Sequence, residues 1–514
     1  MKNKSENSKF ISGTLWLGLS AIVLKVIGVI YKIPLSYYLG DEGMGYFNSA
    51  YTVYTFFYIL GSAGIPKAIA LLTSRATDEK REYEIYSTGI KAFFALGIIL
   101  TAVLLGFSKP LSVFIGSERS YYSIIGIAPS VMFVCAIGVM RGYLNGKMRF
   151  EKIAVSELIG ALSKLVLGLI FAYMGIRASL PLEIISSLAI LGITLGSFFS
   201  FLYLAKNIKR QGARSPYDMR IIREILKISL PLTLSASING IAGLVDLTMI
   251  LRGLTSIGYT DGVATVLYGN YSTLAIPMFS MLVALVTPVS VSVLPLLSKS
   301  HSLGNNEEFY NHLRTFSDVM SLISIPSFFV FLFFSEECLV LLFEESSAVL
   351  GAPMLTVLSP SVLFFSVLLL VNTSLEATGE IKIPVISISI GALAKLLIGV
   401  VLIRNEIIGI FAAPIGTVAS YAISLLISYL LSLKTGSIPY RPTRKSLGFA
   451  VMGILSLIFT LVLKKSLNLY VSRRLSSLLI LSFYGLVYIG LVVILYRKQI
   501  EKLKKIGILH KKSE

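Results

Sequence analysis

Long apolar runs recur along the whole chain and are separated by short polar segments. A transmembrane α-helix needs about 20 consecutive, mostly apolar residues. Read with that window, the pattern predicts about fourteen transmembrane helices, so we expect an all-α integral membrane protein. The predicted spans lie near residues 10–38, 46–72, 86–107, 122–140, 153–174, 183–205, 229–251, 263–297, 316–334, 354–375, 384–403, 407–433, 447–463 and 477–496.

The composition leaves little room for a soluble domain. Of the 514 residues, 55% are hydrophobic and 14% are charged, and the mean hydropathy is +0.80. Soluble proteins carry roughly 25% charged residues. Residues 1–9 are polar and precede an apolar stretch too long for a signal peptide, which predicts an uncleaved first span. The two cysteines, Cys135 and Cys338, and the three histidines form no metal-binding or redox motif.

The basic residues are distributed unevenly between alternate loops. With a cytoplasmic amino terminus, the loops and tails on the cytoplasmic side carry 31 lysines and arginines, and the loops on the other side carry 9. This imbalance predicts a multi-pass protein of the cell membrane with both termini in the cytoplasm. The net charge of +19 does not indicate nucleic-acid binding, because these residues flank span ends, where anionic lipid headgroups are sufficient partners.

An internal repeat is visible without gaps at an offset of 231 residues. Leucines coincide often by chance when two apolar segments are aligned. Two aligned glycines and an aligned lysine within predicted spans are therefore stronger evidence of a repeat. The repeat relates spans four and five to spans ten and eleven, so its unit is six spans and both copies have the same orientation. Matching positions include Pro129, Ser156, Gly160, Lys164 and Gly168, which fall on Pro360, Ser387, Gly391, Lys395 and Gly399.

The repeat predicts two parallel six-helix lobes, residues 1–214 and 215–434. Residues 435–514 would add two further helices and a basic cytoplasmic tail. Two parallel lobes with a site between them are typical of secondary transporters that work by alternating access.

Charged residues inside spans are functional candidates, because a charge at the bilayer centre costs at least about 2.5 kcal/mol. Most of them are cationic here, and the candidate substrate-binding residues are Lys25, Lys32, Lys164 and Lys395. Several lysines and few acids suit an anionic substrate, such as a phosphate or pyrophosphate headgroup. No metal site or catalytic residue is predicted.

Two carboxylates also fall inside predicted spans. Glu157 lies seven residues before Lys164 on the same helical face, where it could form a structural ion pair or take part in coupling. Asp246 lies seven residues after Asn239 on one face of span seven, and these two are the candidate site for a coupling Na⁺ or H⁺. A pairing of Asp246 with Lys25 or Lys32 is equally allowed.

Several segments resemble the stage V sporulation protein B family of polysaccharide-biosynthesis membrane proteins. This family belongs to the multidrug/oligosaccharidyl-lipid/polysaccharide exporter superfamily, and the resemblance spans nearly the whole chain. The segments are Lys25–Gly28, Ile33–Leu35, Leu39–Gly45, Gly61–Ala68, Arg141–Gly146, Ser359–Pro360 and Leu375–Gly379.

The resemblance implies two six-helix lobes and, as in lipid II flippases, two extra terminal helices that hold the lipid tail. It places Lys25 at the position of a basic residue in the first span of those flippases. Their central arginine in span eight is replaced by Ser272, which leaves the carried glycan open. Sodium coupling through a span-seven carboxylate occurs in some members, which is the part that Asp246 would play.

The expected function is export of an undecaprenyl-pyrophosphate-linked glycan, either lipid II or another cell-envelope oligosaccharide. A multidrug cation antiporter with the same fold is one alternative, and a non-transporting cell-wall scaffold is another. An enzyme is not expected, because the polar loops carry no nucleophile–base pair and no phosphate-binding glycine loop. The expected partners are the bilayer, the anionic lipid-linked glycan and, as a candidate, the cell-wall synthesis machinery.

Overall fold

The computed structural model describes residues 2–208, 218–434, 443–467 and 472–510. Within these ranges the regular structure is helical and contains no strand, which confirms the all-α prediction. Clustering of the chain's internal contacts gives two compact units, unit 1 (Met1–Thr273) and unit 2 (Leu274–Glu514).

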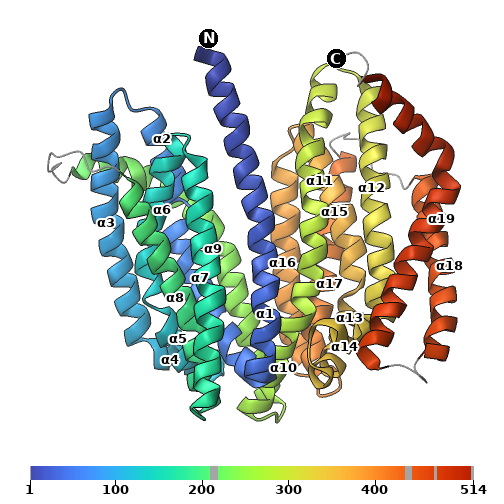
Figure 1. Cartoon of the computed structure of the whole chain (residues 1–514), viewed down its shortest axis with the longest axis horizontal. Coiled ribbons are helices and arrows are strands. Elements are labelled where there is room, and N and C mark those ends of the chain that lie inside the picture. Colours follow the sequence, from blue (N-terminus) through green and yellow to red (C-terminus); the bar gives the residue numbers. More distant parts are fainter. Residues whose placement is uncertain (1, 209–217, 435–442, 468–471, 511–514) are drawn as a thin grey trace. The chain divides into compact units, whose positions relative to one another are not determined.

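Unit 1 combines long helices, such as α1, α3 and α7, with short ones, such as α4 and α5 (Figure 1). Its elements are α1 (Lys2–Ser62), α2 (Ile65–Ser74), α3 (Glu79–Gly106), α4 (Ser108–Ile115), η1 (Glu118–Ser120), α5 (Tyr121–Ile127), α6 (Ser130–Gly146), α7 (Phe150–Arg177), α8 (Leu182–Asn207), α9 (Met219–Ser256) and α10 (Asp261–Asn270). A π-helical turn, η2 (Tyr271–Ala275), links α10 to unit 2.

Helix α1 consists of two segments that meet at Gly40. The φ of 59° and ψ of −174° at this residue are non-helical, and glycine adopts a positive φ easily because it lacks a Cβ. The first predicted span falls on the first segment, and the second predicted span covers most of the second segment and most of α2. The second segment packs closely on α10, since a Cβ added at Gly269 would clash with the backbone oxygen of Asp41.

The core of unit 1 joins helices that are far apart in the sequence. Ile69 of α2, Val139 of α6, Leu204 of α8 and Ile225 of α9 are completely buried in one apolar cluster. The first turns of α9 therefore join an apolar cluster with α2, α3, α6 and α8. Polar residues define where helices begin: Asp78 caps α3 by accepting a 2.6 Å hydrogen bond from the backbone N–H of Arg81.

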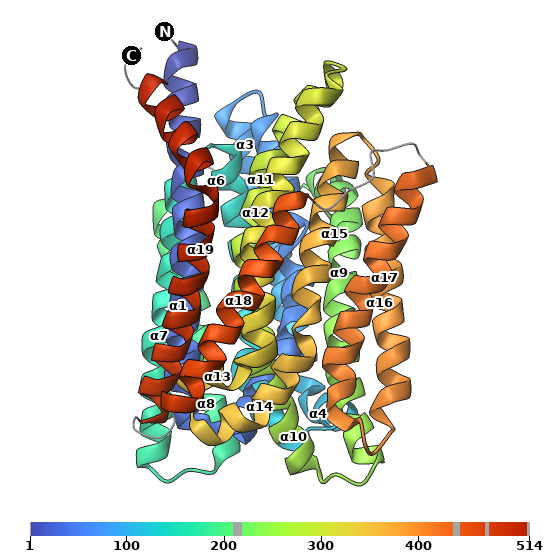
Figure 2. The same ribbon diagram turned by 90° about the vertical axis from the view of Figure 1, so that its right-hand side faces the viewer.

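Unit 2 contains the remaining helices, of which α16 and α17 lie side by side (Figure 2). The last two helices pack on α12 and α13 through a buried cluster that includes Phe334, Leu457, Ile480 and Tyr484. The elements are α11 (Ile276–Ser302), α12 (Asn306–Phe333), α13 (Ser335–Leu342), α14 (Glu345–Leu358), α15 (Pro360–Ala377), α16 (Lys382–Ile403), η3 (Gly409–Phe411), α17 (Ala412–Lys434), α18 (Arg444–Leu467) and α19 (Arg473–His510).

Eleven helices of the described ranges are long and apolar enough to cross a membrane, or up to twelve if the bent pair Glu118–Ile127 and Ser130–Gly146 forms one span. The stretch Val23–Ser74 counts once although it holds two predicted spans, and α9, which holds the seventh, is not among them. Large apolar side chains such as Val401 and Leu486 are exposed, as a hydrocarbon solvent allows. The chain is a multi-pass membrane protein, and the count of fourteen stays a prediction.

The internal repeat has a counterpart in the helix boundaries. Helix α6 ends at Gly146 and α15 at Ala377, a separation equal to the repeat offset. Pro129 precedes α6 and Pro360 begins α15, and in each copy a short apolar helix, α5 or α14, comes before the proline. The lobe boundaries near residues 214 and 434 and the parallel arrangement of the lobes stay predictions.

Candidate functional site

A cavity of about 530 Å³ lies within unit 1, bounded mainly by α1, α6, α7 and α8. This volume is in the range of small-molecule binding sites, which is about 300–1,000 Å³. Its lining includes aromatic side chains of α1 and glycines and serines of α7 and α8, and Arg141, Glu157 and Lys164 supply the charges.

Lys164 reaches the cavity from α7 and lies against two tyrosines. Its Nζ atom is 4.8 Å from the ring centroid of Tyr31 and 5.5 Å from that of Tyr51, so the ammonium group is stabilised by the negative faces of both rings. Among the described residues it has no ion-pair partner. The predicted substrate-binding lysine of span five is thus placed where an anion could reach it.

Glu157 pairs with an arginine that the sequence did not single out. Its Oε1 atom lies 3.4 Å from Nη1 of Arg141 on α6. Arg141 also donates from Nε to Ser156 Oγ at 3.1 Å and from Nη2 to Ser200 Oγ at 3.4 Å. In the sequence it stands out only as the first residue of the family-like segment Arg141–Gly146 and as one of several basic residues at span ends.

The second copy of the repeat contains an equivalent polar contact without the cation. Asn372 stands at the position of Arg141 and accepts a 2.7 Å hydrogen bond from Ser428 Oγ, which also contacts Ser387 Oγ at 2.7 Å. Ser387 corresponds to Ser156, and the position of Glu157 is taken by Ile388. The ion pair is therefore a feature of the copy in unit 1.

Lys32 and Lys164 come close together, whereas Lys25 lies further along α1. The half-buried Lys32 donates from Nζ to the backbone oxygen of Ser272 at 3.4 Å, and its charge is near enough to that of Lys164 for the two to repel. Lys25 is exposed, and the cavity is lined by its neighbour Leu24. A role for Lys25 stays a prediction.

The remaining predicted site residues lie elsewhere. Asp246 on α9 is partly buried and close enough to Tyr268 for an electrostatic interaction, and the Tyr268 hydroxyl lies 3.1 Å from Thr52 Oγ1. The side chain of Asn239 is outside the described residues. Lys395 is half-buried on α16 of unit 2. No group of three or more potential metal ligands occurs in the part of the chain that was described.

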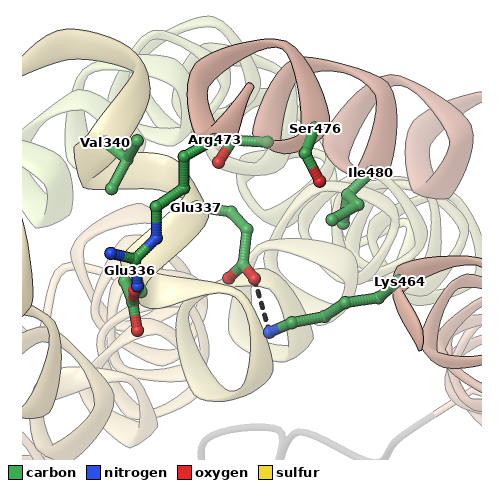
Figure 3. A pocket seen from close by; sticks show the side chains of 8 residues that line it. Glu336, Glu337, Val340, Lys464, Arg473, Ser476 and Ile480 are labelled. Carbon is green, nitrogen blue, oxygen red and sulfur yellow. Dashed lines mark hydrogen bonds and ion pairs between the residues drawn. The ribbon is translucent and has the colours of Figure 1, made fainter. Parts of the chain in front are cut away.

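A second, smaller cavity of about 380 Å³ lies within unit 2, between α13, α18 and α19. Figure 3 shows Lys464 directed at Glu337 and Arg473 directed at Glu336. Arg473 also pairs with Glu345. Because the acids and bases in this cavity pair with one another, it is better explained as an ion-pair cluster that holds the last two helices than as a substrate site.

Two family models match the chain. One, described as a polysaccharide biosynthesis protein, covers residues 10–301, and the MatE model covers residues 272–401. Stage V sporulation protein B of Bacillus subtilis is 22% identical over 462 residues, or 87% of this chain and 88% of the relative. The lipid II flippase MurJ of the same organism is 22% identical over 479 residues, or 85% and 84%.

Solved structures have the same fold. A lipid II flippase MurJ in an inward closed conformation has a TM-score of 0.75 at 17% identity, and the match covers 95% of this chain and 100% of that one. An inward-facing multidrug resistance MATE transporter has a TM-score of 0.63 at 13% identity, with coverage of 82% and 98%. Since the polysaccharide biosynthesis model matches more than half of its length, the chain belongs to the polysaccharide biosynthesis protein family.

Proposed function

We propose that this protein is a flippase that exports an undecaprenyl-pyrophosphate-linked glycan, lipid II or another cell-envelope oligosaccharide, by alternating access. The observation that carries the proposal is the cavity of unit 1, where Lys164 and Arg141 stand among tyrosines and serines. Lysine and arginine both bind phosphate, lysine as a point charge and arginine through its planar fork. Membership of the family supports the same conclusion.

Lys32 supports the proposal of an anionic substrate near Ser272, the position where this chain departs from lipid II flippases. Those flippases carry a central arginine where this chain has Ser272, and the ammonium group of Lys32 lies 3.4 Å from the backbone oxygen of Ser272. A cation is therefore present at this place, although it comes from α1. In this proposal Lys25, Lys32 and Lys164 of unit 1 and Lys395 of unit 2 are the substrate-binding lysines.

The charge of the substrate helps to drive export. Moving one negative charge outward across an inside-negative membrane gains about 2.3 kcal/mol per 100 mV. Both termini would lie in the cytoplasm, and Asp246 with Asn239 would hold a coupling Na⁺ or H⁺. Lipids of the bilayer would surround the membrane-spanning helices. The cell-wall synthesis machinery is the candidate protein partner.

The geometry favours an anionic substrate over the cationic drug of an antiporter. Glu157, the carboxylate among the charged residues that line the cavity, is paired with Arg141. With Lys164 present as well, the formal charge contributed by these three side chains is positive. A non-transporting scaffold would have no need of charged groups around an internal cavity.

The test is complementation of a strain depleted of its lipid II flippase, together with a measurement of lipid-linked glycan exposed on the outer leaflet. Lys164→Glu should abolish exposure at a normal membrane protein level, and Lys164→Arg should retain much of it. Lys109→Glu, on an exposed lysine outside the cavity, is the matched control. Near-normal exposure by a stable Lys164→Glu variant would contradict the proposed headgroup site.

A further inference from the structure

A stripe of tyrosines lines the cavity along the second segment of α1. Tyr51, Tyr54 and Tyr58 fall on one helical face because they are three, four and seven residues apart. Their ring centroids are 5.9 Å apart between Tyr51 and Tyr54 and 5.7 Å apart between Tyr54 and Tyr58. The stripe continues at its other end to Phe47, which is buried and stacks on Tyr51 with a centroid distance of 6.4 Å.

Two rings of this stripe are open to the cavity. Tyr51 is 40% exposed and Tyr58 is 38% exposed, whereas Tyr54 is only 5% exposed and supports them from between. Seven residues of α-helix correspond to about 10.5 Å. One hexose ring does not cover this distance, but two linked rings do.

Most of the residues of α7 and α8 that line the cavity are small. Gly160 and Ala161 of α7 and Gly196 and Ser197 of α8 line it, and none of them has a long side chain. The two glycines also let α7 and α8 approach closely, since a Cβ at Gly196 would clash with the backbone oxygen of Gly160. The cavity lining thus combines aromatic rings of α1 with small residues of α7 and α8, some of which carry a hydroxyl group.

The charges are placed at the two ends of the stripe. Lys164 lies against Tyr51. The Arg141–Glu157 pair lies near the end of α1 that contains Tyr58, because α6 packs there: a Cβ on Gly138, one turn before Arg141, would approach Pro66 at 3.6 Å. A ligand bound along the stripe would therefore have its phosphate at Lys164 and hydrogen-bonding groups at the other end.

We propose that Tyr51 and Tyr58 form a saccharide platform, which binds at least two neutral sugar rings of a pyrophosphate-linked oligosaccharide. A pyranose has an apolar face of C–H groups and a polar edge of hydroxyl groups, and tyrosine offers a ring face and a hydroxyl to match both. An organic cation could also stack on these rings, but Lys164 and Arg141 would repel it. The inference rests on the proposed function and names the part of the substrate that the stripe recognises.

The experiment measures binding to the purified full-length protein in lipid nanodiscs. The probes are undecaprenyl pyrophosphate without sugar, the same lipid with one and with two N-acetylhexosamine residues, and a soluble disaccharide 1-phosphate. We expect the wild type to bind the disaccharide lipid at least about tenfold more tightly than the bare lipid, a difference of about 1.4 kcal/mol. Tyr58→Leu should remove most of this gain without changing affinity for the bare lipid, and Tyr58→Phe, which keeps the ring face and loses only the hydroxyl, should retain more of it than Tyr58→Leu.

Two control variants distinguish loss of sugar binding at the platform from unfolding and from loss of phosphate binding. Tyr259→Leu removes a tyrosine of similar exposure, 39%, in the turn between α9 and α10, and should leave all affinities unchanged. Lys164→Ala should weaken binding of all four probes by a similar factor. Equal melting temperatures of the variants would show that the changes in affinity are not caused by unfolding.

The outcomes distinguish this inference from the proposed function. Tight binding of the bare lipid without a sugar-dependent gain, or a gain that survives in Tyr58→Leu and Tyr51→Leu, would overturn the platform and leave the flippase proposal standing. Tyrosine-dependent binding of the soluble disaccharide phosphate with no binding of any lipid probe would support the platform and contradict a lipid-linked substrate. Binding of none of the probes would overturn both.

Discussion

Arg141 and Asn372 occupy equivalent positions in the two copies of the repeat. Because one is an arginine and the other an asparagine, only the copy in unit 1 has a cation at this position. Arg141 contacts Ser156 and Ser200 from the two following long helices, whereas Asn372 contacts Ser428, which in turn contacts Ser387. Only the arginine requires a counterion, and Glu157 supplies it at 3.4 Å. The polar contact therefore joins three helices in each copy, and in unit 1 it also carries charge into the cavity.

Replacing Arg141 by the residue of the other copy tests whether its charge serves transport or only packing. Arg141→Asn should lower glycan exposure by about tenfold or more, because a charge-assisted hydrogen bond to the substrate is worth about 1.4 kcal/mol or more. It should also lower the amount of protein, because Glu157 loses its partner.

The double variant Arg141→Asn/Glu157→Ile should restore the protein level but not the activity, since it reproduces the uncharged contact of unit 2. The measurement is glycan exposure divided by membrane protein level. Arg177→Asn, at the far end of α7 and outside the cavity, is the control. Full activity of the double variant would show that Arg141 has a packing role alone.

Lys25 is the position that the family resemblance favours most, and its exposure on α1 makes it a poor structural ion pair. If it contacts the substrate phosphate, Lys25→Arg should keep much of the activity. Lys25→Ala and Lys25→Glu should be well expressed but inactive, and Lys25→Glu should be the worse because it adds repulsion. Normal flipping by a stably expressed Lys25→Glu variant would exclude contact with the headgroup.

At the scale of elements, the ion-pair cluster explains how the C-terminal helices are held. Helix α19 begins with Arg473 and Arg474, and positive charge at a helix amino terminus is unfavourable. Glu336 and Glu345 pair with Arg473 and offset this cost, while Lys464 at the end of α18 pairs with Glu337 (Figure 3). The short helix α13 therefore links the end of α18 and the start of α19 to the rest of unit 2.

The two ion pairs of α13 should differ in strength because their burial differs. Arg473 is half exposed, and exposed pairs contribute about 0.2–1 kcal/mol each, so Arg473→Ala should lower the melting temperature by only a few degrees. Glu337 is 8% exposed and its partner Lys464 is 30% exposed, so this pair is screened less by solvent than the pairs of Arg473. Glu337→Ala should therefore cause the larger shift.

Thermal unfolding in nanodiscs, followed by circular dichroism, measures both effects. Lys465→Ala, which removes an exposed lysine next to Lys464, is the control and should change the melting temperature by less than either variant. Equal shifts for Arg473→Ala and Glu337→Ala would mean that burial does not determine the strength of these pairs.

At the scale of the whole molecule, the distribution of basic loops predicts the orientation in the membrane. A labelling test needs exposed positions outside the predicted spans. Ser346, Thr77 and Ser302 are exposed and suit it, whereas Ser117 is only 1% exposed and does not. Burial also raises the pKa of the Cys338 thiol to about 12, so this cysteine has little reactive thiolate at neutral pH.

Single cysteines in a variant lacking Cys135 and Cys338 should reveal the orientation. A membrane-impermeant maleimide should label a cysteine at Ser346 in intact cells and should spare cysteines at Thr77 and Ser302 until the membrane is opened. Labelling at Thr77 in intact cells would place the amino-terminal half the other way round and would refute the predicted cytoplasmic termini.

The energy source is also a property of the whole transport cycle. If Asp246 holds a coupling cation, Asp246→Asn should abolish the dependence of glycan exposure on the sodium or proton gradient and should leave protein levels unchanged. Transport by everted vesicles with each gradient imposed separately is the measurement. An ion dependence equal to that of the wild type would leave Asp246 with a structural role beside Tyr268.

The sequence by itself determined that the protein lies in a lipid bilayer and has an all-α fold, and it revealed the internal repeat and the family. These properties depend on local quantities: apolar runs of sufficient length, the spacing of glycines and prolines, and the charge of short loops. The confirmed all-helical fold and the helix boundaries at Gly146 and Ala377 follow from them. Lys164 could also be picked out, because a charge inside an apolar run is conspicuous wherever the helix packs.

Only the tertiary structure decided which groups share a cavity. Arg141 is one basic residue among many near a span end, and its contacts with Ser156, Glu157 and Ser200 require three helices to pack together. The tyrosines of α1 could equally have faced lipid, since aromatic residues are common at membrane interfaces. Their place in one cavity with small residues depends on how α7 and α8 pack, and side-chain contacts between helices are not encoded in the periodicity of any one of them.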